Sequence, residues 1–152
     1  MNSRVGWTLL TVVSIIIVVS AVFLIVTPAP TQAPTKEMLG TGKGPFVSEN
    51  VKVSAPLPGA KVSRTFTISG EARGQWYFEA SFPVQVRDSN NNLIAQSHAE
   101  AKSDWMTTDW VPFTSTIAVQ NYSGPATLVL LKDNPSGLPE NEDAVEFSIT
   151  IQ

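Results

Sequence analysis

Apolar side chains at every second position dominate the C-terminal part of this chain, and no other feature restricts its fold as strongly. The pattern is most regular over residues 76–87. One set of alternate positions there is apolar throughout: Trp76, Phe78, Ala80, Phe82, Val84 and Val86. Successive side chains of a β-strand point to opposite faces, so this spacing predicts a core strand with one buried face.

Further segments of the same character surround this strand. An Asp, a Ser and three Asn at 88–92 predict a hairpin loop that leads to a strand over 93–102. Shorter strands are expected at 47–53, 64–70, 113–119, 126–131 and 145–151. No run of ten or more residues in this region has helical periodicity. The sequence therefore predicts an all-β domain, an immunoglobulin-like antiparallel β-sandwich of about seven strands with Trp76 in its core, and a small β-barrel is the alternative.

The N-terminal region has a different composition. After a short tail, residues 1–4, the segment 5–26 has 22 residues without Asp, Glu, Lys or Arg, most of them Val, Ile and Leu. As a helix it would be roughly 33 Å long, enough for a hydrocarbon core of about 30 Å. A cleavable signal peptide is the alternative, but its apolar core usually has only about 7 to 15 residues. We expect one transmembrane helix that remains as a signal anchor.

A linker separates this segment from the folded domain. Residues 27–45 contain four Pro and three Gly, a composition typical of an extended and flexible spacer. The 107 residues that follow, 46–152, have the length of one domain with its own core. Basic residues flank the apolar segment almost equally, but the short leader favours an extracytoplasmic C-terminal domain. The predicted location is the cell membrane, with a single pass.

Composition argues against catalysis. The chain has no cysteine, a single histidine and a net charge of −3 at pH 7. Without cysteine there is no disulfide and no lipid-modified N-terminal cysteine. His98 is expected on the polar face of its strand, and one histidine alone supplies neither a typical metal site nor a catalytic triad. The negative charge argues against nucleic acid. We expect no enzyme activity, no cofactor and no nucleic-acid partner.

Acidic residues gather near the C-terminus, and such residues are candidates for a calcium site. The weak candidates for metal ligands are Asp133, Glu140, Glu142 and Asp143. Their spacing matches no EF-hand loop. A solvated acidic loop that contains Pro135, Gly137 and Pro139 is the favoured interpretation, and no metal site is predicted.

Aromatic residues are the other candidates for binding. Trp105 and Trp110 lie in the segment 103–112, which lacks clean alternation and contains Asp104 and Asp109. Loop aromatics of this kind contact a protein partner or stack on sugars when they are exposed. They also commonly cover the open end of a β-sandwich core. Tyr77 is a further candidate contact.

Four segments of the chain are similar to a known family. They are Gly70–Val84, Asp104–Met106, Val111–Phe113 and Lys132–Glu140. Together they resemble the immunoglobulin-like domain of bacterial spore germination, the Gmad type, over about residues 48–151. The resemblance implies a bacterial envelope protein with an immunoglobulin-like fold and no assigned catalysis, in a family often joined to other germination or sporulation modules.

Two functional hypotheses follow from these features. In the first, the chain is a membrane-tethered extracytoplasmic module that binds another envelope protein through a sheet face, a strand edge or an aromatic patch, and the resemblance implies a link to sporulation or germination. In the second, it binds a carbohydrate of the cell wall through Trp105, Trp110 and Tyr77. Exposure of the two tryptophans in the structure distinguishes the two.

Overall fold

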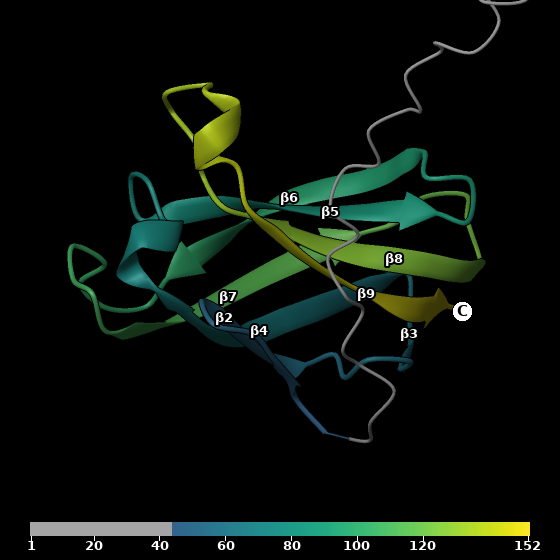
Figure 1. Cartoon of the computed structure of the whole chain (residues 1–152). Coiled ribbons are helices and arrows are strands. Elements are labelled where there is room, and N and C mark those ends of the chain that lie inside the picture. Colours follow the sequence, from purple (N-terminus) through teal and green to yellow (C-terminus); the bar gives the residue numbers. More distant parts are fainter. Residues whose placement is uncertain (1–43) are drawn as a thin grey trace, which may run out of the picture. The chain divides into compact units, whose positions relative to one another are not determined.

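The computed structural model describes residues 44–152 (Figure 1). In order, these residues form β1 (Phe46–Val47), β2 (Val51–Ala55), β3 (Lys61–Val62), β4 (Thr65–Arg73), the 3-10 helix η1 (Gly74–Trp76), β5 (Ser81–Asp88), β6 (Leu93–Ala101), β7 (Trp110–Ala118), β8 (Gly124–Leu131), the 3-10 helix η2 (Pro139–Asn141) and β9 (Ala144–Ile151). The prediction of an all-β domain is confirmed for this part of the chain.

The predicted tail 1–4, transmembrane helix 5–26 and nearly all of the linker 27–45 lie outside the described residues. Within 44–152, no helix has the length and the apolar character that crossing a membrane requires.

The strands form one continuous sheet in the order β1-β2-β4-β7-β6-β5-β8-β9-β3. Neighbours are antiparallel except for β3, which runs parallel to β9. The two halves of the sheet meet between β6 and β7, which pair only through Glu100 with Thr114 and Ala101 with Phe113. The expected sandwich of two sheets is therefore a single sheet in this structure, joined at that short contact.

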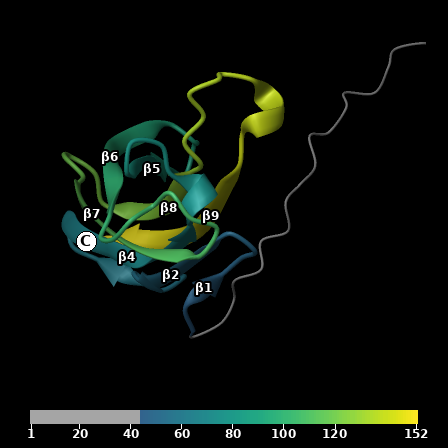
Figure 2. The same cartoon turned by 90° about the vertical axis from the view of Figure 1, so that its left-hand side faces the viewer.

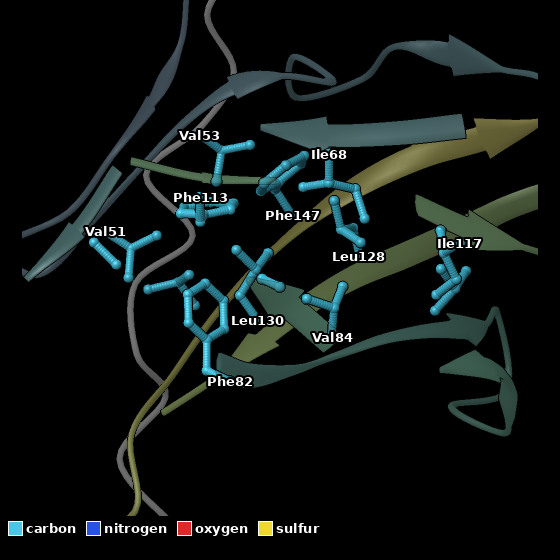
Figure 3. Close-up of a cluster of buried hydrophobic side chains, with 14 of the residues drawn as sticks. Val51, Val53, Ile68, Phe82, Val84, Phe113, Ile117, Leu128, Leu130 and Phe147 are labelled. Carbon is cyan, nitrogen blue, oxygen red and sulfur yellow. The ribbon is translucent and has the colours of Figure 1, made fainter. Parts of the chain in front are cut away.

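The sheet curls, so that strands distant in its order face one another. The rings of Phe46 in β1 and Phe147 in β9 stack with centroids 5.3 Å apart. Figure 3 shows the apolar side chains of both halves converging on the space between them. Phe82 is central, with its ring centroid 5.0 Å from Phe113 and 5.1 Å from Tyr77. Burial of each large apolar side chain contributes about 1.5 to 3 kcal/mol.

The core closes among the strands of the domain itself. Its buried side chains extend from Val51 to Ile151, and Trp76 is among them at 1% exposure, as predicted. A domain of this size with a complete core of its own meets the requirement for independent folding. Residues 44–152 therefore form a suitable unit for experiments in solution.

Two strands were not foreseen as separate elements. The segment expected as one strand at 47–53 is interrupted at 48–50, where Ser48 Oγ accepts a hydrogen bond from the Val51 amide at 3.0 Å and donates one to the Val51 carbonyl at 2.9 Å. This turn folds β1 back onto β2. The other added strand, β3, has only two residues, so the described domain has nine strands instead of about seven.

The strand expected over 76–87 begins later than predicted. Trp76 ends η1, and Phe78 and Ser81 bond each other's backbone at 3.0 Å in both directions. The two residues between them, Glu79 and Ala80, have φ of 49° and 62°. This tight turn changes the alternation, so Tyr77 is buried and Phe78 is exposed. From Phe82 onward the predicted phase is confirmed.

The predicted hairpin loop at 88–92 is confirmed, and Asp88 organises it. Its Oδ1 accepts hydrogen bonds from the amides of Asn90 and Asn92, each at 2.8 Å, and its Oδ2 accepts one from Asn92 Nδ2 at 2.9 Å. These bonds lower the pKa of the Asp88 carboxyl, with the Asn92 side chain as the largest cause.

Candidate functional site

The antiparallel register places four loops at one end of the domain. The end of β4 pairs with the starts of β2 and β7, the end of β6 with the start of β5, and the end of β8 with the start of β9. The connections that meet there are 48–50, 74–80, 102–109 and 132–143, which we call the loop end. It is the left-hand side of Figure 1 and faces the viewer in Figure 2.

Backbone hydrogen bonds join these loops to one another and to the strands beside them. The Arg73 amide donates to the Asn50 carbonyl at 2.9 Å, and the Gly74 amide donates to the Asp109 carbonyl at 3.2 Å. The Ala101 amide donates to the Ala80 carbonyl at 2.8 Å, and the Asp133 amide donates to the Trp76 carbonyl at 3.0 Å. Every one of the four loops takes part in at least one such bond. The loop end is thus a connected surface supported by the sheet.

Gly74 shows how closely two of the loops approach. A Cβ at this position would lie 1.9 Å from the Thr107 carbonyl oxygen and 2.3 Å from that of Trp105. Carbon and oxygen atoms without a bond between them do not approach so closely. Only glycine lets the loop 102–109 pack against η1.

The turn at Glu79 and Ala80 is conformationally costly. A two-residue hairpin of this kind needs positive φ at both central residues, and it normally takes Asn, Asp or Gly there. A residue with a Cβ in the left-handed region costs about 1 to 2 kcal/mol. The turn holds Phe78 and Glu79 at the surface of the loop end, where both are exposed.

Three large apolar side chains are exposed on the loop end. Phe78 is 41% exposed, Met106 is 76% exposed and Leu138 is 49% exposed. Each comes from a different loop. Leu138 is held by polar neighbours, since its carbonyl accepts a hydrogen bond from Asn134 Nδ2 at 2.8 Å and its amide donates to Ser136 Oγ at 3.3 Å.

Sequence reasoning did not select these three residues. Alternation places Phe78 on the buried face, and it makes no prediction for Met106 and Leu138, which lie outside the predicted strands. The signal available in the sequence was a large apolar residue between turn-forming residues, as in Ser136-Gly137-Leu138-Pro139. Such residues have no strand face on which to be buried.

The two candidate tryptophans have structural contacts. Trp105 is partly buried and packs against the core. Trp110 begins β7, and its ring centroid lies 3.9 Å from Lys52 Nζ and 4.3 Å from Arg73 Cζ. Arg73 also donates from Nη1 to the Thr108 carbonyl at 3.2 Å. The Trp110 ring thus already stacks with two cations, an interaction worth about 0.5 to 1 kcal/mol at an exposed site.

Tyr77 is not a surface contact. It is 4% exposed, and its hydroxyl donates a hydrogen bond to the Val111 carbonyl at 2.8 Å. Burial is the largest cause that raises the pKa of this phenol far above its ordinary value. The suggestion that Tyr77 contacts a ligand is wrong, because the turn that follows it reverses the expected alternation.

Asp104 and Asp109 lie in the loop 102–109, and both are exposed. Asp104 Oδ1 accepts a hydrogen bond from the Met106 amide at 3.0 Å. The Asp109 amide donates to Thr107 Oγ1 at 3.2 Å. These bonds give the loop its shape and help present Met106.

The acidic candidates for metal binding are not brought together. No group of three or more His, Asp or Glu side chains within 44–152 is arranged to hold a metal ion. Glu140 and Glu142 are exposed beside η2, whereas Asp133 and Asp143 are half-buried at the two ends of the loop 132–143. His98 is exposed on β6, as its strand phase predicts.

The comparison with protein families accords with this architecture. The model of the Gmad2 family, the immunoglobulin-like domain of bacterial spore germination, matches residues 50–137, more than half of the chain. The chain belongs to the Gmad2 family. No curated protein matches it.

Much of the Gmad2 resemblance rests on residues with structural roles. Trp76 and Tyr77 are core residues, and Gly74 permits the loop contact described above. Gly70 is equally constrained, since a Cβ there would lie 2.0 Å from the Lys52 carbonyl oxygen. The family match ends at Gly137, while β9 completes the core beyond it.

Proposed function

We propose that this Gmad2 domain is a non-catalytic interaction module that binds another protein of the bacterial envelope through its loop end. The observation that carries the proposal is the exposure of Phe78, Met106 and Leu138 on loops that are bonded to one another. Exposed apolar side chains on an ordered surface favour association, because little conformational entropy remains to be lost. The family suggests that this association serves sporulation or germination.

We also propose that the domain is tethered to the cell membrane and lies outside the cytoplasm. The uncharged apolar segment 5–26 supports the tether, and the Pro- and Gly-rich linker 27–45 would separate the domain from the bilayer. Extraction of membranes at alkaline pH tests the tether. Full-length chain that stays with the lipid supports it, and release into the soluble fraction contradicts it.

Carbohydrate binding by the aromatic residues has less support. Sugar stacking needs a free ring face. Tyr77 is buried, Trp105 packs against the core and Trp110 stacks with Lys52 and Arg73. Co-sedimentation of residues 44–152 with cell-wall sacculi tests this alternative. Saturable binding that the variant Trp105→Ala, Trp110→Ala loses, while it remains folded, would favour the wall-polymer hypothesis.

Site-specific photo-crosslinking tests the interaction itself. A photoreactive amino acid replaces Met106 or Leu138 in the full-length chain, expressed in the source bacterium. The matched control carries it at Leu93, which is 51% exposed at the opposite end of the domain. We expect a discrete crosslinked protein from the loop end and none from Leu93. Equal crosslinking at both ends, or none at the loop end, would refute the proposal.

A further inference from the structure

The charge of this domain is unevenly distributed. The loop end contains eight acidic residues and two basic ones, a net charge of −6. The rest of 44–152 contains four acidic and five basic residues, a net charge of +1. All of the net negative charge of the described domain therefore belongs to the end that exposes the three large apolar side chains.

The acidic side chains of the loop end are available to a partner. Glu79, Asp104, Asp109, Glu140 and Glu142 are all exposed. The ion pairs among the described residues are Lys52 with Glu71 at 3.6 Å and Lys102 with Glu100 at 3.7 Å, and neither uses an acid of the loop end. Lys102, one of the two basic residues there, is thus engaged by a strand residue.

We propose that the loop end binds a cationic, amphipathic segment of a partner protein, one that carries Lys or Arg beside large apolar residues. This inference rests on the proposed function and adds the chemistry of the partner. The apolar groups of that segment would contact Phe78, Met106 and Leu138, and its cations would face the exposed carboxylates of the same four loops. Charge complementarity of this kind accelerates association and disfavours wrong partners.

The same charge pattern disfavours anionic partners. Phospholipid headgroups and phosphate-rich wall polymers would meet repulsion from the loop end, because the two cations at its border, Lys52 and Arg73 beside Trp110, do not cancel its net charge of −6. A basic protein segment is the partner class that both the apolar and the charged features of this surface fit.

Three synthetic peptides of equal length serve as probes. The Lys/Leu peptide is composed of Lys and Leu, the Glu/Leu peptide of Glu and Leu, and the Lys/Ser peptide of Lys and Ser. Binding to residues 44–152 is measured by fluorescence anisotropy at low and high salt. Two double variants remove the same charge. One carries Glu140→Gln and Glu142→Gln in the loop end, and the other carries Asp88→Asn and Glu146→Gln in the strands, where neither acid belongs to the ion pairs of Lys52 and Lys102. Thermal unfolding confirms that each variant is folded.

We expect the Lys/Leu peptide to bind at least about tenfold more tightly than the other two, with weaker binding at high salt. The loop-end variant should weaken this binding about tenfold and the strand variant less than about twofold. Equal weakening by both variants would show a non-specific charge effect and overturn the inference. Equal binding of the Glu/Leu peptide, or binding to vesicles of anionic phospholipid, would overturn it too.

The crosslinking experiment separates the failure of this inference from the failure of the proposed function. A loop-end crosslink to a protein segment without Lys or Arg would refute the partner chemistry and leave the interaction module intact. Absence of any loop-end crosslink would refute the interaction module itself.

Discussion

Gly74→Ala is the substitution whose effect the structure specifies most directly. The added Cβ would meet the carbonyl oxygens of Thr107 and Trp105 at 1.9 and 2.3 Å, and both are backbone atoms that no side-chain rotation can move. Overpacking of this kind costs about 1 to 3 kcal/mol. Displacement of the loop also threatens the bond from the Gly74 amide to the Asp109 carbonyl, worth about 0.5 to 1.5 kcal/mol.

One effect acts in the opposite direction. Replacement of Gly by Ala restricts the unfolded chain and stabilises the fold by about 0.4 to 1 kcal/mol where the backbone allows it. The net expectation is a loss of about 2 to 3 kcal/mol in the free energy of unfolding. For a domain of this length that corresponds to a decrease in Tm of roughly 8 to 15 °C.

The assay is chemical and thermal unfolding of residues 44–152, followed by circular dichroism. Gly44→Ala is the matched control, because a Cβ there would meet no atom within 4 Å. Its free energy of unfolding should stay within about 0.5 kcal/mol of the unsubstituted domain. If Gly74→Ala stays within the same limit, the close packing of the loop against η1 is refuted.

Three further predictions concern stability. Ala80→Gly should raise the free energy of unfolding by about 0.5 to 1 kcal/mol in guanidinium titrations, because relief of the left-handed strain outweighs the entropy that glycine adds to the unfolded chain. A lower free energy of unfolding would contradict the strained turn. Tyr77→Phe should cost about 1 kcal/mol at neutral pH by removing the bond to Val111. Folding raises the pKa of Tyr77, so the stabilising effect of its neutral phenol is complete below pH 10.0, the ordinary pKa, and is lost as pH rises above that value. Tyr77→Phe should therefore lose stability less steeply in alkali than the unsubstituted domain. Folding lowers the pKa of Asp88, so the contribution of its carboxylate to stability is present above pH 3.8, the ordinary pKa, and is lost as pH falls further. Below that pH, the stability of Asp88→Asn should depend less on pH than that of the unsubstituted domain.

Strand periodicity was a reliable guide wherever a strand is long and packs one face on the core. β8 and β9 contain the strands expected from alternation, and β4 and β7 contain all but one residue of theirs. The buried positions of these four strands are apolar except for Ser115. The hairpin loop at 88–92 was equally predictable, because its hydrogen bonds join Asp and Asn residues within five positions of the chain. Such features depend on near neighbours in the chain.

The loop end was only partly predictable. Alternation predicts Tyr77 outside and Phe78 inside, whereas the structure has the reverse because an unusual turn of Glu79 and Ala80 follows them. Neither residue is typical of such a turn, so the local sequence did not predict it. The exposure of Met106 and Leu138 does not follow from the sequence, because it depends on how the loops pack.

The sequence by itself determined the all-β class, most of the strands, the core faces and membership of the Gmad2 family. These follow from side-chain alternation and from short segments of the chain. Only the tertiary structure decided that β6 and β7 join the strands into one sheet, and that four distant loops meet in an acidic surface with three exposed apolar side chains. Strand register brings those loops together, and register depends on contacts between residues that are far apart in the chain.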